Sequence, residues 1–417
     1  MISNNIFIAN SYLVLILPLA LISGPFIPDL IVVLSSIILF LYADRKNFYE
    51  ICKEKLILLF IIFWIIAVLS SLFSNDVIFS LRSSFFYIRF IFLIIVIYFF
   101  LKNFTSLQKK YFKLLIFIFF LIFIDASFQK YFGFNIFGFQ MYHEVRISSF
   151  FRDELIMGSY LVKFYPILIA LTHLFCTKNF KKVFYLLSFI TLISVFLSAE
   201  KSAAAIFLME YLLISFILIK DYKNKIYSLV IPVALLLVLL KSFPGHKQRI
   251  FDQLVANSNN FKTIYSNMHQ AHYVAGYKIF IDNKTIGIGP KMFRVHCNYP
   301  KYLDKNTAID YGAKVSYYSC STHPHNFSIQ ILAETGIFGF ITYLSIYFIF
   351  LKDFIILIFK KEKNKYYVPF YCCVLLNLLY LNPLFPSGNF FNNWLAIIYS
   401  IPIGFYLYFK HKECEKI

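Results

Sequence analysis

Charged residues are scarce in this sequence. Only 15% of its 417 residues are Asp, Glu, Lys or Arg, whereas a soluble domain has about 25%. Hydrophobic residues make up 60% of the chain and aromatic residues 21%. Apolar stretches long enough to cross about 30 Å of hydrocarbon recur along most of the chain, separated by short clusters of lysine. This composition excludes a soluble protein, and the recurrence of the stretches excludes a single membrane anchor.

The first apolar stretch, residues 6–22, lacks both a basic leader and a small-residue cleavage site. We therefore expect a retained helix there rather than a signal peptide. The apolar stretches together predict an all-α integral membrane protein with about twelve transmembrane helices. The expected spans are 5–22, 26–42, 56–73, 84–101, 111–127, 158–176, 182–198, 202–219, 226–241, 328–350, 366–382 and 390–409.

Basic residues are unevenly distributed between the connections. If the N-terminus is cytoplasmic, the cytoplasmic connections and the C-terminal tail carry three to five Lys/Arg each, and the short opposite ones at most one. The positive-inside rule then places both termini in the cytoplasm and leaves one large outer loop between helices 9 and 10. The predicted organisation is a membrane domain (1–241), a loop domain with short helices (242–326) and a second membrane domain (327–417).

The large outer loop contains ten Lys/Arg and four Asp, a net charge of +6. Long translocated loops escape the positive-inside rule, so this charge needs another explanation. It either coats an anionic membrane surface or attracts an anionic substrate such as a diphosphate. Within the loop, the apolar spacing of residues 263–283 predicts an amphipathic helix, and Gly287-Ile-Gly289-Pro290 predicts a turn rather than a phosphate-binding loop.

Two of the seven cysteines, Cys297 and Cys320, lie in this outer loop. In an oxidising compartment they could form a disulfide that closes a loop of about 24 residues and contributes about 3 kcal/mol. A zinc site that combines them with His296 and His323 lacks the close paired spacing of structural zinc ligands. The sequence therefore favours a disulfide over a metal site.

Titratable residues gather where the outer loop meets the tenth span. Pro324 favours a chain break, and Asn326 is a plausible N-cap for a helix that begins at Phe327. His325 lies at the N-terminus of this helix, where the helix dipole disfavours imidazolium and so keeps the ring available as a general base. From chemistry alone, a histidine that merely caps the helix at the interface is an equally good interpretation.

The same segment continues with a carboxylate and two glycines. Glu334 inside a span suggests a partner or a water-filled cavity, and Gly336 and Gly339 suggest close packing of a neighbouring helix. His325-Asn326, nine further residues and Gly336-Ile-Phe-Gly339 fit the pattern His-(Asn/Ser/Gln)-x9-Gly-x-x-Gly. This pattern resembles the motif of the O-antigen ligase family, and twelve spans with a large outer loop before the motif resemble its layout.

The resemblance implies a glycosyltransferase of the bacterial inner membrane with a periplasmic active site. It would transfer a glycan from undecaprenyl diphosphate to a sugar hydroxyl of lipid A–core or another glycan acceptor, among membrane lipids and without metal, cofactor or nucleic acid. His325 would deprotonate the acceptor hydroxyl, which attacks the anomeric carbon with inversion while cations hold the departing diphosphate. The absence of a cytoplasmic nucleotide-binding domain is in keeping with a donor that is not a nucleotide sugar.

Several basic residues near the outer face are candidates for holding the diphosphate, since preorganised cations stabilise a departing phosphate. Arg89 lies deepest in its span and is hard to explain otherwise. Lys201 stands in a tight turn where the family commonly has an arginine, so the charge is kept but the bidentate geometry is lost. The predicted substrate- and diphosphate-binding residues are Arg89, Arg146, Lys201, Arg294, His323, Asn326 and Glu334.

Two other functions stay open. A polysaccharide polymerase of the same superfamily would use another lipid-linked glycan as its acceptor and could share the histidine motif. A transporter of lipid-linked glycan would also need many spans and inward basic residues. A transporter is expected to show internal repeats or broken helices in corresponding halves, and no such symmetry is visible in this sequence.

Overall fold

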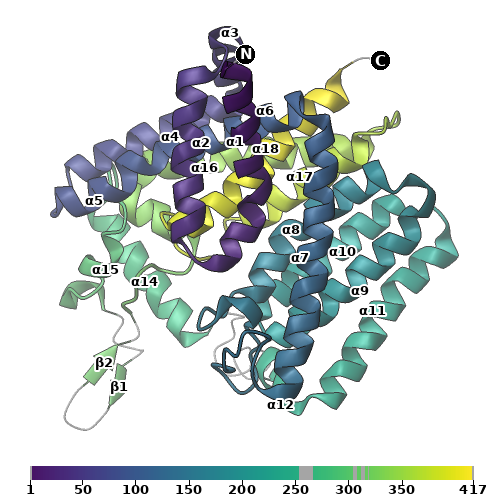
Figure 1. The fold of residues 1–417 in the computed structure, drawn as a ribbon. Helices are drawn as coiled ribbons and strands as arrows, with labels where there is room; N and C mark the ends of the chain where they lie inside the picture. Colours follow the sequence, from purple (N-terminus) through teal and green to yellow (C-terminus); the bar gives the residue numbers. More distant parts are fainter. Residues whose placement is uncertain (1, 253–265, 304–307, 311–314, 318, 416–417) are drawn as a thin grey trace.

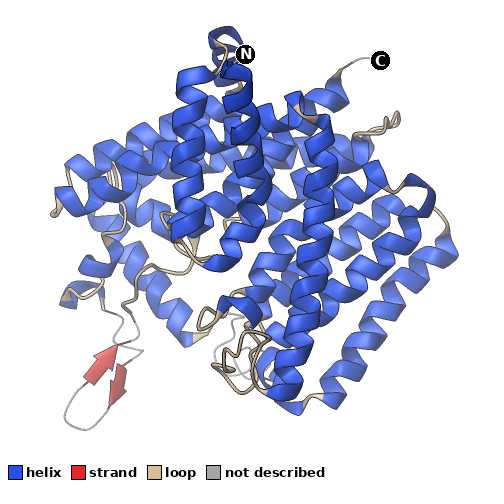
Figure 2. Cartoon of the chain, viewed as in Figure 1, coloured by secondary structure: helices blue, strands red, loops and turns tan. Residues whose placement is uncertain are grey.

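The computed structural model describes residues 2–252, 266–303, 308–310, 315–317 and 319–415. They form a bundle of α-helices, with one small hairpin as the only strands drawn for the described residues (Figure 2). The hairpin pairs β1 (Ala308–Asp310) with β2 (Val315–Tyr317) in antiparallel register, with Ile309 opposite Ser316. The predicted all-α membrane fold is confirmed, and the hairpin is a small addition that the sequence did not indicate.

A helix occupies each of the twelve predicted spans. Their bounds are α1 (Ile2–Ala20), α2 (Phe26–Tyr42), α4 (Lys55–Leu72), α6 (Ile88–Asn103), α7 (Thr105–Phe132), α8 (Met157–Phe175), α9 (Phe180–Ser198), α10 (Lys201–Leu218), α11 (Tyr222–Ser242), α16 (Phe327–Phe359), α17 (Tyr367–Tyr380) and α18 (Asn393–Cys414). Shorter helices are α3 (Arg45–Cys52), α5 (Val77–Ser84), α12 (Pro244–Lys247), α14 (Asn267–Asp282) and α15 (Phe293–His296). Single 3-10 turns occupy Leu21–Ser23, Phe85–Tyr87, Ser149–Phe151, Thr177–Asn179 and Pro300–Tyr302, and a π turn occupies Gln248–Asp252.

The number of membrane crossings differs from the number of predicted spans. Within the described ranges, eight helices are long and apolar enough to cross a membrane, or nine if the sharply bent pair α2 and α3 is one span. Helix α17 has 14 residues and is therefore only about 21 Å long, short of a hydrocarbon core of about 30 Å. The chain is a multi-pass membrane protein, but the predicted count of twelve is not confirmed.

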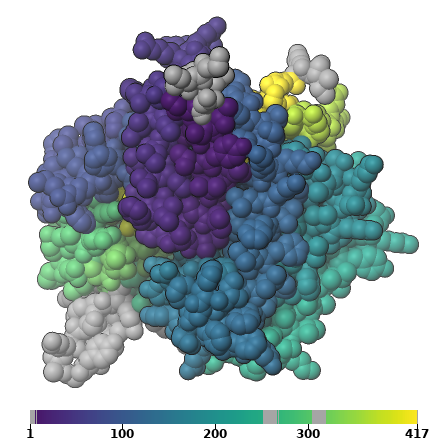
Figure 3. All heavy atoms as spheres, in the orientation of Figure 1, coloured from purple at the N-terminus to yellow at the C-terminus, as the bar shows by residue number. Residues whose placement is uncertain are grey.

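Both chain ends lie at one end of the bundle, and α12, α14, α15 and the hairpin lie at the other (Figure 1). Much of the face seen in Figure 3 is formed by the N-terminal part of the chain, including α1, α2 and α7. Helix α18 lies beneath it and packs against α6 and α2. The helix predicted at 263–283 is observed as α14. Its predicted first residues, 263–265, lie outside the described residues, as do the loop charges Lys262, Asp304, Lys305 and Lys314.

The interior of the bundle is built around α17. All 14 of its residues are buried, because α8, α10, α16 and α18 pack around it. Helix α11 lies at the other extreme, since Ser228 is its only buried residue. The apolar surface of α17 is thus covered by other helices, whereas α11 exposes an apolar surface suited to lipid.

Helix α16 is broken at Gly336, which has φ +67°. A Cβ atom at this position would collide with the carbonyl oxygen of Thr285. The loop residue Lys284 accepts a backbone hydrogen bond from Ile337 at 2.8 Å. We expected the two motif glycines to admit a neighbouring helix, but Gly336 instead breaks its own helix and admits the backbone of the loop, while Gly339 faces the side chain of Thr335.

Candidate functional site

His325 lies at the junction between the loop segment and α16. Asn326 caps the helix as predicted, with its Oδ1 accepting a hydrogen bond from the Ile329 N–H at 3.1 Å. Asn326 also donates from Nδ2 to the carbonyls of Pro383 and Phe385, both at 3.2 Å. His325 itself has φ +56°, a left-handed conformation that is uncommon for a residue with a side chain. Such strain, held in place by the surrounding bonds, is a feature of functional sites.

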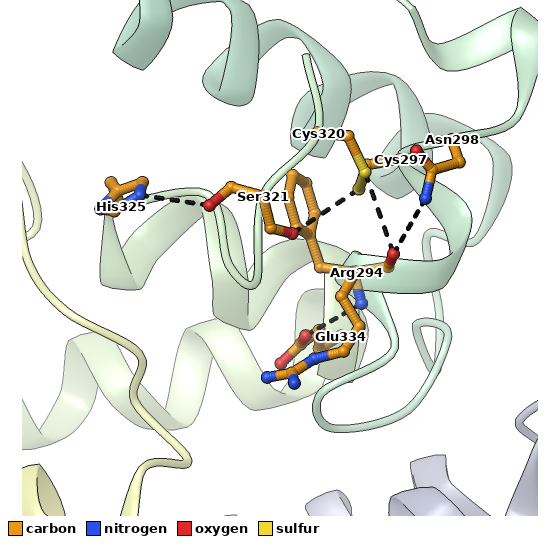
Figure 4. The surroundings of a disulfide bond; sticks show 8 residues. Arg294, Cys297, Asn298, Cys320, Ser321, His325 and Glu334 are labelled. Atoms are coloured by element: carbon orange, nitrogen blue, oxygen red, sulfur yellow. Dashed lines mark hydrogen bonds between the residues drawn. A yellow bond between two sulfur atoms is a disulfide. The ribbon is translucent and has the colours of Figure 1, made fainter. Parts of the chain in front are cut away.

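A disulfide anchors the chain segment that leads to His325. Cys297, after α15, is joined to Cys320, and their Cα atoms are 5.0 Å apart (Figure 4). The bond is the pairing expected from the sequence. The side chain of His272 in α14 also hydrogen-bonds to the backbone of Cys320. The segment that carries His325 is therefore tied to both α14 and α15.

Four imidazole rings gather at this junction. The ring of His325 has its centroid 4.0 Å from that of His323, 5.2 Å from that of His272 and 5.3 Å from that of His269. Its Nε2 lies 3.4 Å from the hydroxyl of Ser321, which points toward it (Figure 4). Within the described ranges, no group of three or more His, Cys, Asp or Glu side chains is arranged to hold a metal ion.

Burial keeps these rings neutral. It lowers the pKa of His325 to about 4, with a smaller contribution from the positive charge of His269. Burial, followed by the charges of neighbouring histidines, lowers the pKa of His272 to about 4 and that of His323 to about 3. A neutral imidazole can accept a proton, so His325 is in the form that a general base requires.

The low pKa of His325 predicts an acid-tolerant activity. An ordinary histidine, with a pKa of about 6.5, is about nine-tenths protonated at pH 5.5, whereas His325, at about 4, stays neutral there. Because kcat/KM reports the ionisation of the free enzyme, we expect kcat/KM at pH 5.5 to lie within about twofold of its value at pH 7. A tenfold decrease in kcat/KM between these pH values would show that the base is protonated at pH 5.5 and would contradict the low pKa of His325.

The same shifts bear on stability. In the unfolded chain these histidines take up protons as the pH falls through about 6.5, whereas the folded chain does so only at lower pH. The folded state therefore loses stability as the pH falls between about 6.5 and 4. Activity in the pH 5.5 measurement must accordingly be normalised to the fraction of protein that remains folded.

Two cavities meet at His325. The larger has a volume of about 1230 Å³ and lies between the N-terminal helices, the 133–156 connection and the start of α18. The smaller has a volume of about 300 Å³ and lies between α8, α10, α17 and α18. The residues that line both are Ser159, Lys163, His323, His325 and Gly388. His325 thus lies where two adjoining cavities meet.

The buried carboxylate of Glu200 lies beside Ser159, which lines both cavities. This carboxylate accepts hydrogen bonds from the Gly158 N–H at 2.7 Å and from the Ser159 hydroxyl at 2.5 Å. Arg146 attracts it electrostatically. Burial raises the pKa of Glu200 despite these bonds. Two sequence candidates, Arg146 and Lys201, are therefore brought to one place.

Arg249 belongs to the same group. Its Nε donates to the Ala199 carbonyl at 3.2 Å, and its charge, after burial, lowers the pKa of Arg146. Lys201 in turn lies close enough to His269 for its charge to lower the pKa of that histidine, again after burial. Lys201 thus lies near the imidazoles, and Arg249 lies near both Lys201 and Arg146.

Arg294 approaches from the other side, where it lines the larger cavity. It lies beside Glu334 (Figure 4). Glu334 is fully buried and lines neither cavity. Its carboxylate accepts hydrogen bonds from the Phe293 N–H at 3.1 Å and from Gln330 Nε2 at 2.9 Å. Glu334 therefore holds the turn that carries Arg294, and its hydrogen-bond partners are backbone amides and a glutamine.

Arg89, the arginine that the sequence placed deepest, has a carboxylate partner. Its guanidinium lies 2.8 Å from the carboxylate of Asp29 in α2 and over the ring of Phe90. It lines neither of the two cavities at His325. Its assignment to substrate binding stays a prediction, while the structure shows it joining α2 to α6.

Three residues near the cavities, Lys163, His269 and Arg249, were not predicted from the sequence as site residues. Lys163 could have been found, because an ionisable residue inside an apolar span suggests a functional role, and that reasoning was applied only to Glu334. Arg249 was counted only within the charge of the outer loop. His269 comes from a helix more than fifty residues before the motif, and no local pattern connects it to His325.

The chain was compared with known proteins. Residues 186–344 match a protein-family model described as O-antigen ligase. The matched segment extends from within α9 into α16 and contains Lys201, Arg249, His269 and the motif of His325. No curated protein matches the chain.

Proposed function

We propose, from the match of residues 186–344 to the family model described as O-antigen ligase, that the protein transfers an O-antigen-like glycan from undecaprenyl diphosphate to a sugar hydroxyl of lipid A–core. We propose further that it does so in the bacterial inner membrane, with the site at the periplasmic face and both termini in the cytoplasm. The large loop end of the bundle, opposite both termini (Figure 1), is then the periplasmic end.

One observation carries the proposal: a neutral histidine lines two cavities at once. A transfer between two lipid-linked substrates needs a base that reaches the acceptor hydroxyl while the donor is bound beside it. Lys201 lies near His269, which lines the smaller cavity, and Arg249 lies near both Lys201 and Arg146. This arrangement favours the donor diphosphate in the smaller cavity and the acceptor in the larger one.

In the proposed reaction the acceptor oxygen attacks the anomeric carbon of the donor sugar. The bond from that carbon to the diphosphate oxygen breaks with its electron pair on the diphosphate, and the hydroxyl proton passes to the neutral imidazole of His325. A single displacement inverts the anomeric carbon. Fixed cations stabilise the charge that develops on the diphosphate, because they need no reorganisation during the reaction.

The product distinguishes this function from polymerisation. The purified protein in nanodiscs is supplied with undecaprenyl-diphosphate-linked glycan and lipid A–core, in the presence of excess EDTA. We expect glycan joined to lipid A–core, formed at the same rate as without the chelator. Longer glycan that is still attached to undecaprenyl diphosphate would identify a polymerase. Loss of transfer that added divalent ions restore would overturn the metal-independent mechanism.

A further inference from the structure

Lys163 is an unpaired cation inside the bundle. It lies in α8, its residue is only 7% exposed, and it lines both cavities at His325. Among the residues that the structure describes, it has neither a hydrogen bond nor an ion pair, although Glu200 lies near enough to attract it. A buried ammonium without a partner is costly, so its presence calls for an anion that is bound at some stage.

Three aromatic rings surround the ammonium. Its Nζ lies 5.4 Å from the ring centroids of Tyr380 and Tyr399 and 5.8 Å from that of Trp394. Such contacts stabilise a desolvated cation in part, but aromatic faces leave its N–H donors without acceptors. These three rings hold Lys163 in place beside the cavity and do not neutralise its charge.

Two other residues that line the same small cavity have donors without a partner. The hydroxyls of Tyr380 and Ser387 are buried and have no hydrogen-bond partner within the described part of the chain, and both residues line this cavity. An ammonium and two hydroxyls can all donate to phosphate oxygens. The three groups come from α8, from the end of α17 and from the connection that follows α17.

The depth of Lys163 indicates which phosphate these donors meet. Ser159 lies at the level of Glu200, to which it is hydrogen-bonded, and Glu200 immediately precedes Lys201. Lys163 follows Ser159 by one helical turn, about 6 Å further from the loop end of the bundle. A polyprenyl diphosphate has one phosphate on the lipid side and one on the sugar side, and the lipid-side phosphate lies deeper.

We propose that Lys163, together with the hydroxyls of Tyr380 and Ser387, binds the lipid-side phosphate of a polyprenyl diphosphate. The cations Lys201 and Arg249 then bind the sugar-side phosphate, one helical turn nearer to the loop end. This inference rests on the proposed function for the identity of the ligand. It adds a second, membrane-embedded phosphate site with its own residues.

Binding of two lipids separates the two sites. The full chain in nanodiscs is titrated with undecaprenyl monophosphate and with undecaprenyl diphosphate. Lys163→Met removes the charge but keeps the length, and we expect it to weaken the binding of both lipids by about 10- to 100-fold. Lys201→Met should weaken the binding of the diphosphate by about tenfold and that of the monophosphate by less than threefold. Lys163→Arg should retain most of the binding.

Several outcomes would overturn the proposal. Unchanged monophosphate binding by the folded Lys163→Met protein, while the unaltered protein transfers glycan, removes this inference and leaves the proposed function intact. Failure of the unaltered protein to bind either polyprenyl lipid removes both. Displacement of the monophosphate by an equal amount of phosphatidylglycerol would identify an ordinary headgroup site instead. Should Lys163→Met lose its fold, Tyr380→Phe, which removes only a hydroxyl, must still weaken monophosphate binding.

Discussion

Replacement of His325 by alanine is expected to lower glycan transfer by about 10²- to 10⁴-fold, the contribution of a general base. The physical reason is that the acceptor hydroxyl then has no neutral imidazole at the meeting point of the two cavities. The measurement is the rate of transfer by purified protein with a defined lipid-linked donor. Binding of the donor should change much less, because the cations Lys201 and Arg249 remain.

Two controls separate lost chemistry from lost structure. His325→Asn introduces a residue that tolerates the left-handed backbone at this position. Because it also removes the base, it should be as inactive as His325→Ala. His143→Ala makes the same substitution at an exposed histidine outside the site and should leave the rate unchanged. Transfer by His325→Ala at more than a third of the unaltered rate would refute the role of this histidine.

Loss of the Cys297–Cys320 disulfide is expected to have the second large effect. Replacement of both cysteines by serine should lower the free energy of unfolding by about 3 kcal/mol, since the bond closes a loop with a sequence separation of 23. Transfer should decrease as well, because the segment from Cys320 to His325 loses its tie to α15. The thermal unfolding midpoint in detergent and the transfer rate measure the two effects separately.

The matched control is Cys414→Ser, which removes an exposed free cysteine far along the chain in α18. It should change neither the unfolding midpoint nor the rate. Mass-shift labelling of the unaltered protein should find Cys297 and Cys320 protected until a reductant is added. Labelling of both thiols without reduction would show that the predicted stabilisation does not exist in the cell.

The sequence predicted the helices well because a helix in hydrocarbon needs a continuous apolar run. It could not predict the number of membrane crossings, because a helix covered by lipid and a helix covered by other helices have the same apolar composition. Helix α17 is the clearest case: its residues are all buried in protein, and its length falls short of a membrane.

The site was predictable only where one motif carried it. His325 and Asn326 are adjacent in sequence and hold the positions expected of them. Arg89 and Asp29 form an ion pair between two spans, and a single sequence does not reveal such a pairing. Lys163 and His269 likewise reach the cavities from segments far from the motif, through tertiary packing alone.

The break at Gly336 divides α16 into two parts of different length. Without it, the 33 residues of α16 would form a rod of about 50 Å, much longer than the hydrophobic thickness of a membrane. The part after the break, residues 337–359, is about 34 Å long and matches that thickness. The part before it, residues 327–335, is then a half-helix at the water–lipid boundary. In the proposed function, the second half of the sequence motif therefore sets the depth at which His325 would meet lipid-bound substrates.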